Sequence, residues 1–158
     1  MNALISALDN ESRLYGDLLV LLAQKRDALV ALKTADVDRI VAQEEALLSS
    51  LSEADALRRR AAAEAGRAAG LPPGATLRQI AGRDSRLTPL RDRLQKLMVD
   101  VARANDLNRA LAEQSLAHVR ETLLVLTGVE LDAAAYTRRG AEAPPPASSR
   151  VNIVDSVA

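Results

Sequence analysis

The sequence predicts an all-α fold, an antiparallel helical hairpin followed by a third long helix in an elongated, coiled-coil-like three-helix bundle. Three observations support this prediction. Apolar residues recur at three- and four-residue steps over three long stretches. A segment rich in Gly and Pro at residues 70–87 separates the second stretch from the third. Apolar residues form 48% of the chain but aromatic residues only 1%, which favours thin helix seams over a compact globular core.

The first helix is predicted over about residues 2–33, with Asn2 as its N-cap. Its apolar seam steps by three and four residues through Leu4, Leu8, Tyr15, Leu18, Leu22, Leu29 and Leu32. Glu11 and Lys25 occupy seam positions and interrupt this pattern. The interruptions favour an irregular intramolecular hairpin over a long regular coiled coil.

A second helix is predicted over residues 35–69, capped by Thr34 or Asp36 and ended by Gly70. The short turn before it requires the two helices to lie antiparallel. Residues 70–87 read as a connector with one short helical turn at 76–81.

The third helix is predicted over residues 88–127, with Thr88 as its N-cap, Pro89 at its first position and Gly128 closing it. From Asn105 onward, apolar residues cover an arc of roughly 180°, wider than one packed face requires. This arc holds Leu107, Leu111, Leu116, Val119, Leu123, Val125 and Leu126. The excess predicts a docking face for another helix, unless helices of the same chain or a second copy cover it.

Three polar residues have two interpretations each. Asn105 and Asn108 either fix helix register by pairing across the bundle or meet a partner's backbone. Tyr136 suits a peptide-style anchor but equally an unused surface tyrosine. Residues 1–131 are predicted to form the helical domain and residues 132–158 a flexible tail, whose apolar residues at 151–158 could dock on the wide face.

Several function classes are disfavoured. The formal net charge is +0, and the basic run Arg58–Arg60 lacks interleaved aromatic residues, so nucleic-acid binding is not expected. No Cys is present and His118 is the single histidine, so neither a metal nor a cofactor is expected. Catalytic groups do not converge in any motif, so we expect no enzyme. With no signal peptide and no apolar run of membrane-spanning length, we expect a cytoplasmic protein without stable membrane insertion.

Taken in order, the segments resemble the FlgN-type flagellar export chaperones. The resemblance is carried by LLVLLAQKRDALVAL, ADVDRI, EEALLSSLSEADALRRR, GLPPGATLRQIAG, NDLNRAL and YTRRG. The order and spacing of these segments are more specific than any one of them. The Ala- and Arg-rich residues 58–69 depart from the family pattern, which puts the end of the second helix in doubt.

The resemblance implies a cytoplasmic chaperone that binds the C-terminal helical segments of hook-filament junction proteins, prevents their premature association and delivers them to the type III export gate. Together with the apolar arc, it implies a substrate-binding set of Asn105, Leu107, Asn108, Leu111, Leu116, Val119, Leu123 and Leu126. Tyr136 would contact the cytoplasmic domain of the export gate. Alternatives are another small type III chaperone of the FliT type, and a coiled-coil adaptor or scaffold subunit that buries the same face in a homodimer.

Overall fold

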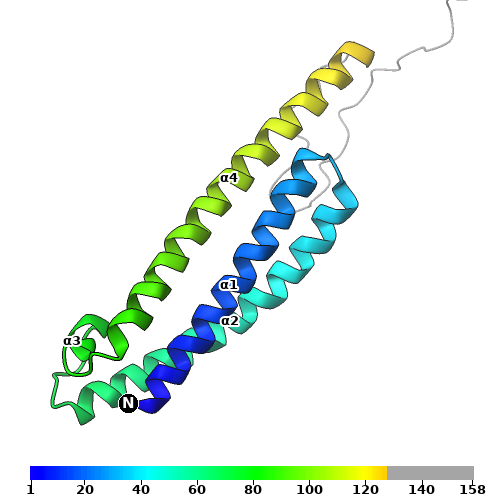
Figure 1. Ribbon diagram of the computed structural model, residues 1–158. Coiled ribbons are helices and arrows are strands. Elements are labelled where there is room, and N and C mark those ends of the chain that lie inside the picture. Colours follow the sequence, from blue (N-terminus) through cyan, green and yellow to red (C-terminus); the bar gives the residue numbers. More distant parts are fainter. Residues whose placement is uncertain (128–158) are drawn as a thin grey trace, which may run out of the picture. The chain divides into compact units, whose positions relative to one another are not determined.

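The computed structural model describes residues 1–127, which form four helices and, within that range, no strand. The helices are α1 (Asn2–Val30), α2 (Thr34–Ala68), α3 (Leu77–Ala81) and α4 (Leu87–Thr127) (Figure 1). The predicted all-α fold is therefore confirmed. The chain divides into two units, residues 1–117 and the residues from His118 onward, so α4 contributes residues to both. The units are described separately.

In the first unit, α1 and α2 lie side by side as an antiparallel hairpin (Figure 1). The two charged residues that interrupt the apolar seam of α1 both find partners on α2. Nε of Arg58 lies 2.6 Å from Oε2 of Glu11, and Nζ of Lys25 lies 2.7 Å from Oε2 of Glu44. In each pair the residue numbers add to 69, so both ion pairs specify the same alignment of the hairpin.

The turn between α1 and α2 ends α1 with a Schellman motif. The Lys33 N–H donates to the Ala28 carbonyl at 3.0 Å, and the Leu32 N–H donates to Leu29 at 3.1 Å. Leu32 takes the left-handed position of this motif, with φ +54°, where glycine is the usual residue. The same motif ends α2, where Gly70 has φ +69°.

The packing of the first unit is made of two apolar clusters. One joins α1 to the α2 end, α3 and the start of α4, through Leu4, Leu8, Ala65, Ile80, Ala81, Leu87 and Leu94. The other joins the middle of the hairpin to α4, through Leu14, Leu18, Leu22, Leu51, Ala54 and Val101. No aromatic ring belongs to the fully buried set of either cluster; Tyr15 packs at the edge of both. Leu and Ala seams thus hold the three long helices together.

The predicted N-caps of the long helices are wrong. Helix α1 starts from Met1 and α2 from Lys33, neither with a side-chain cap, so Asn2, Thr34 and Asp36 lie inside the helices. Helix α4 begins at Leu87, whose N–H donates to Asp84 at 3.1 Å. This preceding turn places Thr88 within the helix rather than before it. Side-chain capping occurs instead at α3, where Thr76 and Gln79 form a capping box.

In the second unit the structure describes residues 118–127, the C-terminal part of α4. The predictions for Gly128, Tyr136 and the tail fall outside the described residues.

Candidate partner-binding surface

Helix α4 buries one seam against the hairpin in the first unit. Its buried and half-buried positions step regularly by three and four residues: Leu87, Leu90, Leu94, Leu97, Val101, Ala104, Asn108, Leu111 and Ser115. This is the spacing of a coiled-coil seam. Of the predicted substrate-binding residues, Asn108 and Leu111 belong to it.

Asn108 is committed to the chain's own packing. It is buried, and its Nδ2 donates to the backbone carbonyl of Leu22 at 2.8 Å. A buried seam asparagine bonded across helices is what the register interpretation predicts. We therefore leave Asn108 out of the surface open to a partner.

The first unit leaves three of the predicted residues exposed on α4: Asn105, Leu107 and Leu116. Leu116 has 51% of its surface accessible, a large fraction for a leucine in a packed bundle. Leu111 is half-buried beside them. A hollow of about 330 Å³ adjoins this stretch, lined by Lys25, Asn105, Asp106, Asn108, Arg109 and Ala112. Most of the side chains that line this hollow are polar or charged.

The second unit also exposes its predicted residues Val119, Leu123 and Leu126, the last of them at 75%. Leu124 and Val125 are exposed as well. Within the second unit, the described residues therefore do not cover these apolar side chains.

The exposed apolar residues of α4 follow a different phase of the repeat from the buried seam. The exposed stripe steps through Ala112, Leu116, Val119, Leu123 and Leu126, each one residue after the phase of the buried seam. Positions that would continue the seam after Ser115 hold His118, Thr122 and Val125; the first two are polar, and Val125 is exposed. One residue corresponds to about 100° of helix rotation, so within the first unit Ala112 and Leu116 lie on a different side of α4 from the buried seam. We call the exposed repeat, which the sequence of α4 continues to Leu126, the open seam.

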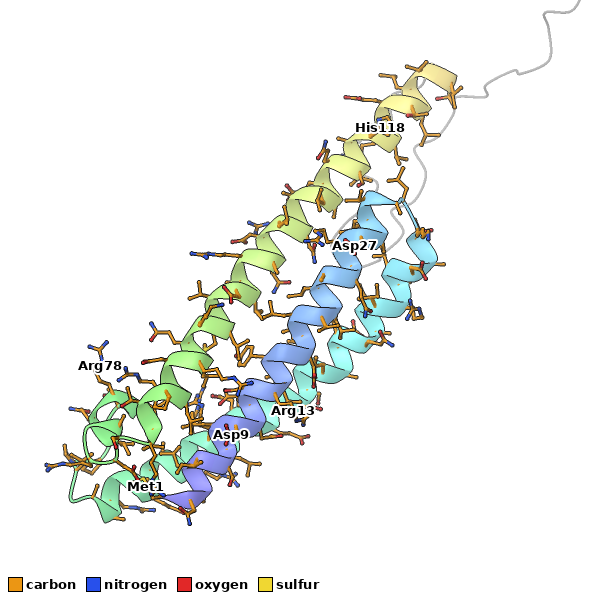
Figure 2. All side chains as sticks on the ribbon, in the orientation of Figure 1. Met1, Asp9, Arg13, Asp27, Arg78 and His118 are labelled. Atoms are coloured by element: carbon orange, nitrogen blue, oxygen red, sulfur yellow. The ribbon has the colours of Figure 1, made fainter. Side chains whose placement is uncertain are left out.

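The remaining candidates for a functional site are His118, a metal site, a membrane span and the basic run Arg58–Arg60. His118 lies on α4 with its side chain exposed (Figure 2). Within residues 1–127 no cluster of His, Asp or Glu could hold a metal ion, and no helix there has a stretch apolar and long enough to cross a membrane. Of the basic run, Arg58 is engaged with Glu11 and Asp55.

Two ionisable groups of the hairpin, Glu11 and Tyr15, have a raised pKa. Burial raises the pKa of Glu11 above its ordinary value, and the adjacent Arg58 guanidinium offsets part of this rise. Burial, with the charge of Glu11, also raises the pKa of Tyr15. Both groups lie inside the helix contacts, which indicates a structural rather than a catalytic role.

The apolar pattern marks Glu11 and Lys25 as interruptions of the seam but does not indicate their partners on α2. For residues 70–87 it indicates only a connector. Residues 72–77 of this segment also form one wall of a hollow beside α2, which Arg59 and Arg67 line in part. The available signal was the run of small residues between arginines on α2.

One comparison with known proteins gives a match. The family model described as "FlgN protein" matches residues 1–144, nearly the whole chain. No curated protein matches the chain, and no solved structure matches it.

Proposed function

Because this chain belongs to the FlgN protein family, which implies a flagellar export chaperone, we propose that it binds the C-terminal helical segments of hook-filament junction proteins in the cytoplasm. Its role there is to cover apolar helices that would otherwise associate too early, and to deliver them to the type III export gate. The chain itself needs no cofactor and performs no catalytic step in this role.

The observation that carries the proposal is the open seam of α4. A seam of coiled-coil spacing with no partner in the described chain is suited to one more amphipathic helix. Its members are Ala112, Leu116, Val119, Leu123 and Leu126, with Leu107 and Asn105 exposed nearby.

The energetics suit a carrier that must release its client. Burying a few hundred Å² of apolar surface at about 25 cal/mol per Å² contributes several kcal/mol before the cost of ordering the client. This permits roughly micromolar binding that remains reversible.

Delivery to the export gate is assigned to Tyr136, from the resemblance of YTRRG to the family. This residue and the apolar segment 151–158 lie outside the described residues, so their roles remain predictions. A version of the chain ending at Gly140 tests whether residues 151–158 compete with the client: faster client binding by the shortened chain would support competition, and unchanged binding would exclude it.

The binding surface is tested with Leu116→Asp and Leu123→Asp, each compared with Val99→Asp. Val99 is also an exposed apolar residue of α4 but lies outside the open seam. We expect both seam variants to keep their helical content and lose co-purification with hook-junction proteins, while Val99→Asp retains both. Unimpaired capture by the seam variants would refute the assignment.

A homodimer that buries the open seam is the main competing role for the same surface. Sedimentation of the full chain distinguishes the two. A stable dimer at micromolar concentration that Leu116→Asp converts to a monomer would favour the adaptor or scaffold function. Co-purification with FliT-type clients instead of hook-junction proteins would favour the other chaperone class.

A further inference from the structure

A second hollow lies in the first unit, between the end of α2 and the loop that leads to α3. Its volume is about 480 Å³. Helix α2 supplies Arg58, Arg59, Ala62, Ala63, Gly66 and Arg67, and residues 72–77 supply the opposite wall.

The hollow follows from the small residues between two arginines. Arg59 and Arg67 are two turns apart, about 12 Å along the helix axis. Ala62, Ala63 and Gly66 lie between them on the same side of the helix. Gly66 is closely packed by the loop and α3: a Cβ there would lie 3.8 Å from both Ala75 and Ile80, an ordinary van der Waals contact. The result is a trough with an apolar floor and a cation at each end.

The wall opposite α2 is well defined. The Ala75 N–H donates to the Pro72 carbonyl at 3.2 Å, with Gly74 at φ +81°, which closes a tight turn. Thr76 then caps α3 through its capping box with Gln79. A wall shaped by these contacts is formed before any partner arrives.

The charge around the hollow differs strongly from that of the whole chain. Residues 56–83 contain six arginines and one acidic residue, Glu64, for a net charge of +5, whereas the chain is neutral. Among residues 1–127, Arg67 and Arg60 have no ion-pair partner. Arg59 pairs with Asp55, but its side chain is exposed and Asp55 also pairs with Arg58. On α3, Arg78 extends away from the fold (Figure 2).

From this geometry we infer that the hollow binds an acidic segment of a partner protein, independently of the client surface on α4. Two carboxylates of the segment pair with Arg59 and Arg67, while small apolar side chains between them lie on Ala62, Ala63 and Gly66. Exposed guanidinium groups bind carboxylates through paired hydrogen bonds. An RNA is disfavoured because no aromatic residue lines the hollow for base stacking. A membrane is disfavoured because the cations surround a concavity rather than a protruding apolar surface.

The test measures fluorescence anisotropy of a labelled peptide made of Glu, Ala and Leu, titrated with the full chain. A peptide with Lys in place of Glu controls for non-specific association. The variant Arg59→Gln with Arg67→Gln removes both cations and retains good helix formers. The matched control, Arg93→Gln with Arg103→Gln, removes two exposed α4 arginines that also lack ion pairs within residues 1–127.

We expect the acidic peptide to bind and the Lys peptide not to bind. The hollow variant should weaken binding about tenfold or more, and the α4 control by less than about twofold. Ala63→Leu fills the floor at an exposed position, so it should also weaken binding while circular dichroism shows an unchanged fold. Absence of binding, or equal loss in hollow and control variants, would overturn the inference. So would binding of anionic vesicles or poly-uridine, with the same arginine dependence, in place of the acidic peptide.

Discussion

The buried ion pair between Glu11 and Arg58 gives the sharpest test of how the hairpin is held. The Glu11 side chain is 3% exposed and that of Arg58 is 22% exposed. Replacing Arg58 with Met keeps an unbranched apolar stem but removes the charge that offsets the burial of Glu11. Breaking a buried pair in this way costs about 3–5 kcal/mol. Because water reaches part of Arg58, we expect a loss near about 3 kcal/mol at neutral pH.

The dependence on pH distinguishes this mechanism from simple loss of packing. Burial already raises the pKa of Glu11, and Arg58 lowers it, so removing Arg58 raises the pKa further. A carboxyl group with a raised pKa in the folded state favours folding when protonated, and that contribution disappears as the pH rises through the folded-state pKa. The destabilisation by Arg58→Met should therefore be largest near about pH 7 and smaller near about pH 5.

Urea unfolding followed by circular dichroism measures the difference from the unsubstituted chain at both pH values. Arg60→Met is the matched control, because Arg60 is exposed and has no ion pair within the described residues; it should change the unfolding free energy by less than about 0.5 kcal/mol. Adding Glu11→Gln to Arg58→Met should remove the pH dependence. A loss below about 1 kcal/mol, or the same loss at both pH values, would refute the reasoning.

The remaining predictions concern stability and use the same unfolding measurement. Leu32→Gly should stabilise by about 0.5–1 kcal/mol, since Leu32 is exposed with φ +54°; destabilisation would contradict this. Gly70→Ala should destabilise by about 1 kcal/mol because Gly70 has φ +69°, and no change would show that the cap relaxes. Asn108→Ala should cost about 1–2 kcal/mol through its lost bond to Leu22, and a neutral result would show that the bond contributes little. Leu94→Ala should cost about 2–5 kcal/mol, and a loss under about 1 kcal/mol would place Leu94 outside the core.

The spacing of apolar residues predicted the fold because each long helix repeats its seam many times. A helix start depends on a few local hydrogen bonds instead, and three starts were wrong for that reason. At α4, for example, the turn from Asp84 to Leu87 begins the helix before Thr88 can cap it.

The candidate surface was only partly predictable. Excess apolar residues on α4 indicated an open face, and the structure leaves Leu116 and Leu123 exposed. The pattern of a single helix could not tell whether Asn108 faces a partner or the hairpin, because that depends on the direction of the neighbouring helix. The hollow beside Gly66 was not predicted because one of its walls is a helix and the other a loop, and no single sequence pattern indicates both.

The matching alignment of the two cross-helix ion pairs has a consequence for the specificity of folding. Sliding α1 along α2 by a single turn would still place apolar residues of one helix opposite apolar residues of the other, so apolar packing alone discriminates poorly between neighbouring alignments. Such a slip would separate Glu11 from Arg58 and, at the same time, Lys25 from Glu44, which would leave buried charges without counter-ions. Two ion pairs that lie far apart but specify the same alignment thus raise the free energy of misaligned hairpins, even though the apolar seam would tolerate them.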